Sequence, residues 1–379
     1  MARFFTPLLL AFALLAAPAL ADDVAKCGTP AALDDGWSLA KPEESGFDAT
    51  RLCELDDFLA QWPAHNIHAV VVVRHGKLVM ERYFKGADER LGRPIGSVQY
   101  GPESRHDLRS ITKSVTSLLI GIALAEGKFP ALDSPVFDQF PEFAALRTAG
   151  KSEITFRHLL TMSSGLAWDE SLPYSNPANS ETRMDEAADP VRYVLEQPLA
   201  TLPGAAYNYN GGGTMLLGAV LAKTTGQRLD AYAREKLFGP LGITDIEWAD
   251  LPATGQPAAA SGLRLRPRDT AKFGQLLLAD GMWNGKQVLP KGWAADSITP
   301  RLTGEGLYYY GYQWWLGRTM LRGRNLLWTA GIGYGGQRLF ILPDLDLVVM
   351  VNAGHYTSPL QGVIPLAVFN RWVLPTTYD

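Results

Sequence analysis

The chemistry of this sequence centres on a serine and a lysine three residues apart. Ser110-Ile111-Thr112-Lys113 is an S-x-x-K pattern at the start of an apolar stretch, expected to be helical from Ser110 to Glu126. Because residues i and i+3 share a helix face, the lysine amine can reach the serine hydroxyl. The helix N-terminus favours an anionic intermediate, and we expect it to help lower the pKa of Lys113 toward that of a neutral base. The pattern is typical of a serine nucleophile with a lysine base; the alternative is a helix-capping serine beside a solvated lysine.

Metal and cofactor chemistry finds little support in the same sequence. The six histidines are scattered, without the H-x-x-x-H or H-E-x-x-H spacing of metal sites. Two cysteines are too few for a zinc cage or an iron–sulfur cluster. His158 is expected to stabilise the start of a helix rather than to bind a metal. We therefore expect no metal and no cofactor.

Composition limits the remaining classes of function. The chain has 379 residues, 47% of them hydrophobic, with a formal net charge of −4. Such a chain has ample apolar surface to bury, which argues against disorder, and its acidic balance gives no electrostatic reason to bind nucleic acid. The length fits one large fold or two interleaved lobes.

The elements that must position the serine and lysine lie at both ends of the chain. Residues 68–84 read as two strands joined at Gly76, and a helical region extends to about residue 260. Further helices are expected over 214–225, 229–238, 267–279 and 365–373, and further strands over 312–316, 326–329, 337–342 and 347–352. We therefore predict an α+β fold in which an antiparallel sheet of N- and C-terminal segments carries an inserted helical lobe.

The N-terminus reads as a secretory signal peptide over residues 1–21. Arg3 precedes an apolar stretch, and Ala19-Leu20-Ala21 resembles a cleavage site. A transmembrane anchor is the alternative, but the apolar run is short. We expect an exported, periplasmic or secreted protein with no membrane span after signal removal. In an oxidising compartment, Cys27 and Cys53 are expected to form a disulfide; two unpaired thiols are the alternative.

Several motifs together resemble the serine hydrolases related to class C β-lactamases, over roughly residues 35–375. They are the S-x-x-K pattern, His158-Leu-Leu-Thr-Met-Ser-Ser-Gly-Leu166, Pro203-Gly-x-x-Tyr-x-Tyr-Asn-Gly-Gly212, Leu237-Phe-Gly-Pro-Leu-Gly-Ile243, Gly262-Leu-Arg-Leu-x-Pro-x-Asp269 and Gly331-Ile-Gly-Tyr-Gly-Gly-Gln337. Within that superfamily the chain looks most similar to the branch of 6-aminohexanoate-dimer hydrolase and related esterases. The resemblance implies a β-lactamase/transpeptidase-like catalytic domain over 22–379, with a sheet lobe at about 35–105 and 265–379 and a helical lobe at about 115–260.

The resemblance also assigns roles to individual residues. Ser110 would be the acylated nucleophile, Lys113 its base and Tyr209 a second acid/base group. Without the family, Tyr207 could compete for the role of Tyr209, since the two share a face of an extended segment. Backbone N–H groups of Ser110 and Ile332 would form the oxyanion hole.

The substrate is less closely defined. Trp168 and Tyr174 lie on a long loop that borders the pocket in the resembling family, and we expect them to contact substrate. Asp169 and Glu170 are expected to be solvated loop charges. The β-lactamase Lys-Thr-Gly strand corresponds to Thr329-Ala330-Gly331, so its lysine is absent and the pocket is expected to lack a cation for a carboxylate. We therefore predict poor β-lactamase activity.

These observations predict a serine hydrolase acting on a small-molecule ester or amide, of either esterase or amidase type. A β-lactamase or cell-wall peptidase of the same superfamily is one alternative, and a non-catalytic binding protein on this fold is another. The sequence does not set the oligomeric state.

Overall fold

The structure, a computed structural model, describes residues 28–378. The expected signal peptide and Cys27 lie outside the described residues, so the cleavage and the Cys27–Cys53 bridge stay predictions. Cys53 is buried on helix α1 (Ala49–Ala60). Among the described helices, none has both the length and the apolar character needed to cross a membrane.

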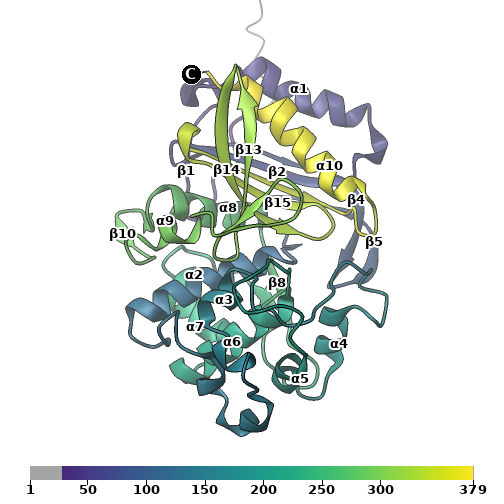
Figure 1. The fold of residues 1–379 in the computed structure, drawn as a ribbon. Helices are drawn as coiled ribbons and strands as arrows, with labels where there is room; N and C mark the ends of the chain where they lie inside the picture. The colour runs from purple at the N-terminus through teal and green to yellow at the C-terminus, as the bar shows by residue number, and fades with distance from the viewer. Residues whose placement is uncertain (1–27, 379) are drawn as a thin grey trace, which may run out of the picture.

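A nine-stranded sheet forms one layer of the molecule (Figure 1). Its order is β1-β3-β2-β16-β15-β14-β13-β12-β11, so strands from the two ends of the chain meet where β2 pairs with β16. This confirms the expected sheet of N- and C-terminal segments. The strands are β1 (Ser38–Leu39), β2 (Ile67–Arg74), β3 (Lys77–Tyr83), β11 (Leu302–Thr303), β12 (Tyr309–Tyr310), β13 (Trp315–Leu321), β14 (Arg324–Gly333), β15 (Gln337–Leu342) and β16 (Leu347–Ala353).

One edge of this sheet departs from the expectation of a purely antiparallel arrangement. The two-residue strand β1 pairs parallel to β3, whereas the other pairs of the sheet are antiparallel. Between β1 and β3 the chain passes through α1 and β2, and such a crossover permits parallel pairing. The sheet is therefore mixed.

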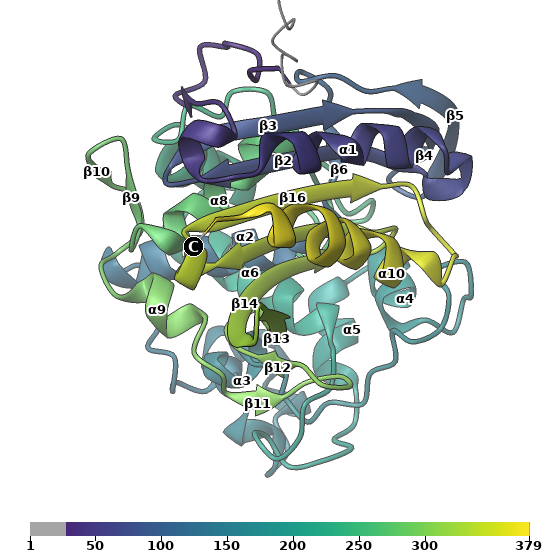
Figure 2. The same ribbon diagram turned by 90° about the horizontal axis from the view of Figure 1, so that it is seen from above.

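Both faces of the central strands are covered, which explains their continuous apolar sequences. In β2, Val71 and Val73 belong to the core on the helical-lobe side, whereas Val70 and Val72 belong to the core under α1 and α10. Figure 2 shows α1 and α10 (Leu360–Ala367) lying across one face of the sheet. Helix α8 (Pro267–Leu278) packs against β2, β15 and β16 on the opposite side.

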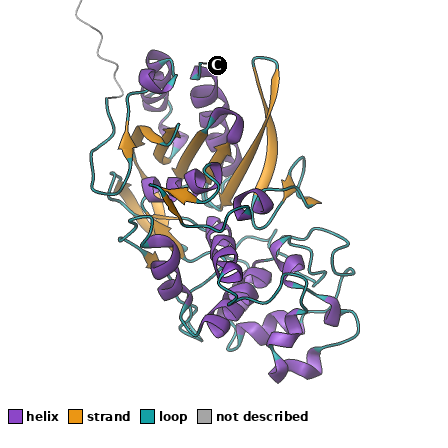
Figure 3. Ribbon diagram, turned by 90° about the vertical axis from the view of Figure 1, so that its left-hand side faces the viewer, coloured by secondary structure: helices purple, strands orange, loops and turns teal. Residues whose placement is uncertain are grey.

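The helical lobe lies below the sheet, as Figure 3 shows. Helix α2 (Ile111–Ala125) lies between the two layers and contacts both α6 and strands β14 and β15. The expected helices at 110–126, 229–238 and 267–279 are present with small shifts at their ends. The helix expected at 214–225 is α6 (Gly211–Thr225), and the one at 229–238 is α7 (Leu229–Ala233) with a π-helical continuation over Arg234–Phe238. The remaining α-helices are α3 (Phe156–Leu160), α4 (Ser180–Glu186), α5 (Pro190–Glu196) and α9 (Trp293–Ser297).

Two expected elements differ in position. The strand predicted over 312–316 is β13, which begins at Trp315 and runs to Leu321. The last helix begins at Leu360 rather than at Pro365, because Pro365 is accommodated inside α10, and it continues as a π-helical segment over Val368–Val373. A proline lacks the backbone N–H, so a sequence reading places it at a helix start rather than inside.

A hairpin that we did not expect lies beside the large sheet. It consists of β4 (Lys85–Arg90) and β5 (Arg93–Gln99), and its polar sequence carries little hydrophobic alternation. A second small sheet contains β6 (His106–Asp107), β8 (Leu263–Leu265) and β7 (Glu247–Trp248). A further pair joins β9 (Met282–Trp283) and β10 (Lys286–Gln287). The strand β6 leads directly into the S-x-x-K segment.

Candidate active site

Ser110 and Lys113 meet at the N-terminus of α2. Lys113 Nζ donates a hydrogen bond to Ser110 Oγ over 3.1 Å and to the carbonyl of Ala260 over 3.2 Å. Ser110 occupies the N-cap position, but its side chain caps no helix N–H, so the hydroxyl is free to face Lys113. Both side chains are buried, with Lys113 only 1% exposed. The expected pairing of hydroxyl and amine on one helix face is present, and the alternative of a solvated lysine is wrong.

The residue before the serine turns the chain sharply. Arg109 has φ = 50°, a left-handed conformation that non-glycine residues rarely adopt. Its guanidinium lies 3.5 Å from Asp107 and 3.6 Å from Glu89, and it stacks over the rings of Tyr334 and Tyr356. These contacts hold the turn in place and thereby fix the position of Ser110 at the start of α2.

Tyr209 approaches the same serine from the segment that precedes α6. It lines the same cavity as Ser110, and its ring centre lies 5.0 Å from Lys113 Nζ. The ring also stacks on Trp315, with 5.7 Å between centroids. Tyr207 instead packs between Tyr310 and Trp315, and its buried hydroxyl has no hydrogen-bond partner. The structure therefore brings Tyr209, and not Tyr207, to the serine.

Two carboxylates that the sequence did not reveal lie near the lysine, the buried Glu181 and the half-buried Glu170. Glu181, at the start of α4, places Oε1 3.7 Å from Lys113 Nζ. Burial alone would lower the pKa of the Lys113 ammonium, but the charges of Glu181 and Glu170 outweigh it and leave that pKa raised. The expectation of a lowered lysine pKa is therefore wrong. In the resting site Lys113 is a protonated amine paired with Glu181.

Glu170 is the second of these carboxylates, and the expectation of a solvated loop charge is wrong for it. Its Oε1 accepts hydrogen bonds from Trp168 Nε1 over 2.6 Å and from the backbone N–H of Gly211. Burial and the charge of Glu181 raise its pKa well above the usual range. Its neighbour Asp169 is exposed, as expected.

The acidic side chains near Lys113 affect one another's pKa values. Burial would raise the pKa of Glu181, but the Lys113 ammonium and hydrogen bonds from Glu170 and Tyr174 outweigh it and leave the pKa lowered. Burial and the charge of Glu181 raise the pKa of nearby Asp185 to about 8. Glu181 is thus the ionised partner of Lys113.

A cavity of about 590 Å³ opens beside the serine. Its lining includes Ser110, Tyr209 and Ile332. Strand β13 pairs with β14 only as far as Ala330, and beyond that ladder Ile332 and Gly333 lie in the cavity wall. This position suits a backbone donor at Ile332 for an oxyanion.

The glycines around Ile332 allow β14 to approach Ser110. A Cβ on Gly333 would lie 2.3 Å from the carbonyl oxygen of Leu108, and a Cβ on Gly331 would lie 3.2 Å from the Ile111 side chain. The contacts of both glycines are therefore with the chain around Ser110, which the strand could not approach so closely with side chains at these positions.

Of the two expected substrate contacts, one lines the cavity. Tyr174 is part of the lining, donates its hydroxyl to Glu181 Oε2 over 3.2 Å, and meets the ring of Tyr334 at 5.0 Å between centroids. Trp168 is buried against Tyr193 and is not among the residues of the cavity wall. Its observed contact is with Glu170, so it holds that carboxylate.

The cavity contains a cation, which corrects the expectation that it lacks one. Arg338 on β15 lies in the wall and donates to the carbonyls of Gly333 over 3.0 Å and Gln337 over 2.9 Å. Among the described residues, no carboxylate lies within 4.0 Å of its guanidinium. Burial lowers the pKa of Arg338 to about 10. A charged residue within an otherwise apolar strand was the sequence signal for it.

Comparisons with known proteins agree with this geometry. A family model described as Beta-lactamase matches residues 56–360. The 6-aminohexanoate-dimer hydrolase of Paenarthrobacter ureafaciens is 26% identical over 325 residues, which are 80% of this chain and 75% of that protein. Esterase EstB of Burkholderia gladioli is 32% identical over 184 residues, which are 46% of this chain and 45% of that protein. The solved octameric penicillin-binding protein homologue from Pyrococcus abyssi shares the fold, with a TM-score of 0.61 and 20% identity over 85% of this chain and 77% of that one.

Proposed function

Because this chain belongs to the Beta-lactamase family of serine hydrolases, we propose that it cleaves an ester or amide bond through an acyl-enzyme on Ser110. The observation that carries the proposal is the contact between Lys113 Nζ and Ser110 Oγ at 3.1 Å, beside a cavity that Tyr209 also lines. A nucleophile, a base and a proton donor in mutual contact are the requirement for acyl transfer by a serine.

Acylation requires that the buried Lys113–Glu181 pair first lose a proton, since the resting amine is protonated. Neutral Lys113 then accepts the hydroxyl proton as Ser110 Oγ attacks the carbonyl carbon. The tetrahedral oxyanion is held by the N–H groups of Ser110 and Ile332. As the bond to the leaving group breaks, that group takes a proton from Tyr209, which recovers one from Lys113. Water then releases the acyl group by the same steps in reverse.

Tyr209 suits the role of proton donor rather than that of resting base. Burial and the charge of Glu170 raise its pKa well above the usual value, and a hydrogen bond from Ser110 only partly offsets this. Its hydroxyl therefore stays protonated until the adjacent Lys113 ammonium can replace the proton that the leaving group takes.

The first experiment is labelling with a fluorophosphonate probe, followed by mass spectrometry of the peptides. We expect the label on Ser110 and no label in Ser110→Ala. Ser117→Ala is the matched control, because Ser117 lies on the same helix with a hydroxyl that has no hydrogen-bond partner. An unlabelled wild-type protein would contradict the proposal and favour a non-catalytic binding protein on this fold.

A second candidate, β-lactamase or cell-wall peptidase activity, is favoured by one observation. Arg338 places a cation in the cavity although the strand lysine is replaced by Thr329. Its guanidinium already binds two backbone carbonyls, so we retain the ester or amide as the preferred substrate. Turnover of short p-nitrophenyl esters should exceed that of nitrocefin and of D-alanyl-D-alanine peptides; the reverse order would favour the second candidate.

We also propose export with cleavage after Ala21 and a Cys27–Cys53 disulfide. The support is the signal-like sequence of residues 1–21. Intact mass and N-terminal sequencing of protein from the exported fraction should give Asp22 as the first residue. Alkylation before and after reduction should label the cysteines only after reduction, and labelling without reduction would contradict the bridge.

A further inference from the structure

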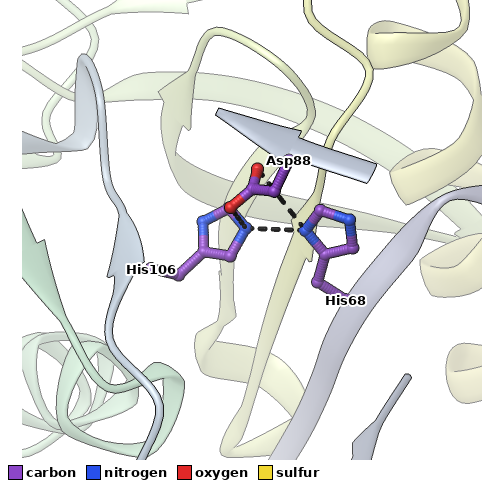
Figure 4. A group of neighbouring side chains, drawn as sticks. All are labelled: His68, Asp88 and His106. Atoms are coloured by element: carbon purple, nitrogen blue, oxygen red, sulfur yellow. Dashed lines mark hydrogen bonds and ion pairs between the residues drawn. The ribbon is translucent and has the colours of Figure 1, made fainter. Parts of the chain in front are cut away.

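Two histidines and an aspartate from three different strands meet in the interior between the β4–β5 hairpin and the large sheet. Figure 4 shows His68 of β2, Asp88 of β4 and His106 of β6 pointing toward one another. His68 Nδ1 lies 2.8 Å from His106 Nε2, and the carboxylate oxygens of Asp88 lie 3.7 Å and 3.6 Å from those nitrogens. All three side chains are buried.

In each ring, the nitrogen that points away from the other histidine donates a hydrogen bond. His106 Nδ1 contacts the backbone carbonyl of Asp107 at 3.0 Å, which can only accept a hydrogen bond. His68 Nε2 contacts Asn66 Oδ1 at 3.2 Å, and the Asn66 amide group is fixed in this orientation because Nδ2 donates to the carbonyls of Ala87 and Gly354. In each neutral ring the remaining nitrogen therefore carries a lone pair.

These two lone pairs face each other. Two acceptors at 2.8 Å repel unless a cation or a proton lies between them. Donation of the outer N–H to a carbonyl or amide oxygen is the arrangement that usually orients a metal-binding histidine.

Asp88 supplies a carboxylate with spare capacity. Its Oδ1 is buried without a hydrogen-bond partner, whereas Tyr100 donates its hydroxyl to Oδ2. The β4–β5 ladder shifts register between Asp88 and Glu89, and such a bulge turns a side chain away from the regular alternation. A buried, unpaired carboxylate oxygen is costly unless a positive partner is present.

Close backbone contacts hold the His68 ring in this place. A Cβ on Gly86 would lie 2.6 Å from His68 Nε2, and a Cβ on Gly354 would lie 2.6 Å from His68 Cε1. Any side chain at either position would displace the ring, so both backbones fit closely around it.

We propose that His68 Nδ1, His106 Nε2 and the Asp88 carboxylate bind one divalent first-row transition-metal ion of the zinc class. Imidazole nitrogen and carboxylate oxygen suit such ions. Zinc–nitrogen bonds are about 2.0–2.1 Å long. With such bonds, the 2.8 Å between His68 Nδ1 and His106 Nε2 gives a nitrogen–metal–nitrogen angle of roughly 85–90°. A tetrahedral angle requires the two nitrogens to move about 0.5 Å further apart. The complete burial of the three side chains indicates a structural ion rather than one that meets substrate.

The ion would join three segments that no single element connects. It would tie β2 of the large sheet and the β4–β5 hairpin to β6, whose next residues lead to Arg109 and Ser110. Tyr356 also supports this turn, because its ring lies under the Arg109 guanidinium. The metal is thus placed to stabilise the turn before the nucleophile.

The test is metal analysis of the full-length protein, purified without a histidine tag from zinc-supplemented cells. We expect about one equivalent of metal per chain, removal by a chelator with a lowered Tm, and recovery of both on adding Zn²⁺. Co²⁺ added to the stripped protein should give visible absorption bands. None of these readouts depends on activity, so the result is independent of the proposed hydrolase function.

Variants locate the ion. His68→Gln should abolish metal binding, and Tyr100→Phe, which removes only the hydroxyl on Asp88, should weaken it by about 10–100-fold. His75→Gln is the control, because His75 is an exposed histidine that contacts Asp346. A wild-type protein that holds under about 0.1 equivalents after Zn²⁺ addition, with no change in Tm, would overturn the proposal and leave a proton shared between the rings as the explanation. That measurement needs no variant to fold.

Discussion

Lys113 Nζ lies 3.1 Å from the Ser110 hydroxyl and 3.7 Å from the Glu181 carboxylate, so the proposed base is itself held in a buried ion pair. The carboxylate keeps the amine protonated at rest. The charge state of this pair therefore controls how much of the enzyme is ready to react at a given pH.

Glu181→Gln should move the rising limb of kcat/KM against pH to lower pH. Removing the carboxylate removes the main cause of the raised Lys113 pKa, so the amine loses its proton at a lower pH. A series of p-nitrophenyl ester assays across pH 5–10 measures the limb, which reports groups of the free enzyme. Glu186→Gln, on the exposed side of the same helix, is the control. An unmoved limb in Glu181→Gln would show that this pair does not set the reactive state.

Tyr209→Phe should lower kcat by about 10²–10⁴-fold, the usual contribution of a positioned proton donor. Tyr207→Phe is the matched control: it removes a hydroxyl two residues away that has no hydrogen-bond partner, and it should leave kcat nearly unchanged. Steady-state kinetics on the same ester compare them. Equal losses in the two variants would mean that Tyr209 acts only by packing.

Arg338→Met should impair turnover of esters that carry a free carboxylate more than turnover of neutral esters. A charged hydrogen bond is worth about 1.5–3 kcal/mol, which corresponds to about 10–100-fold in kcat/KM. Arg338→Lys keeps the charge and should restore part of the difference. Parallel assays with a p-nitrophenyl hemisuccinate and a p-nitrophenyl butyrate give the ratio, and the same loss on both esters would assign Arg338 to holding Gly333 alone.

Gly333→Ala should lower both Tm and kcat. The added Cβ would lie 2.3 Å from the Leu108 carbonyl, and overpacking of this kind costs about 1–3 kcal/mol. Gly362→Ala provides the contrast, because this glycine lies inside α10 with nothing within 4 Å of an added Cβ. It should raise stability by about 0.5–1 kcal/mol. Thermal unfolding checks both variants, and a Gly333→Ala protein with unchanged Tm and kcat would refute the close approach.

The fold was predictable where local pattern and tertiary environment agree. The valines of β2 and the Gly76 turn produce a recognisable hairpin, and the apolar sequence after Ser110 produces α2. The β4–β5 hairpin was not predictable in this way, since its polar strand residues carry no alternation that marks a buried face.

The residues of the candidate site were likewise predictable only where the local sequence determines the contact. Ser110 and Lys113 follow from one helix turn, but Tyr209 needed the family resemblance, because nothing local separates it from Tyr207. Glu181 reaches Lys113 only because the long loop after Trp168 folds back and α4 begins beside it. Its sequence surroundings resemble those of an exposed helix start. The cluster of His68, Asp88 and His106 gathers residues from three strands, so no spacing along the chain reveals it.

The pairing of β2 with β16 also sets the order in which the chain can become a folded protein. Val71 lies opposite Met350, so the centre of the sheet closes only after the chain through β16 has left the ribosome. Contacts between residues so distant in sequence form slowly, and until they form, the apolar edge of β2 stays available to other chains. A protein built in this way depends on its last strand, and a truncation that removes β16 is expected to yield aggregate rather than a weaker enzyme.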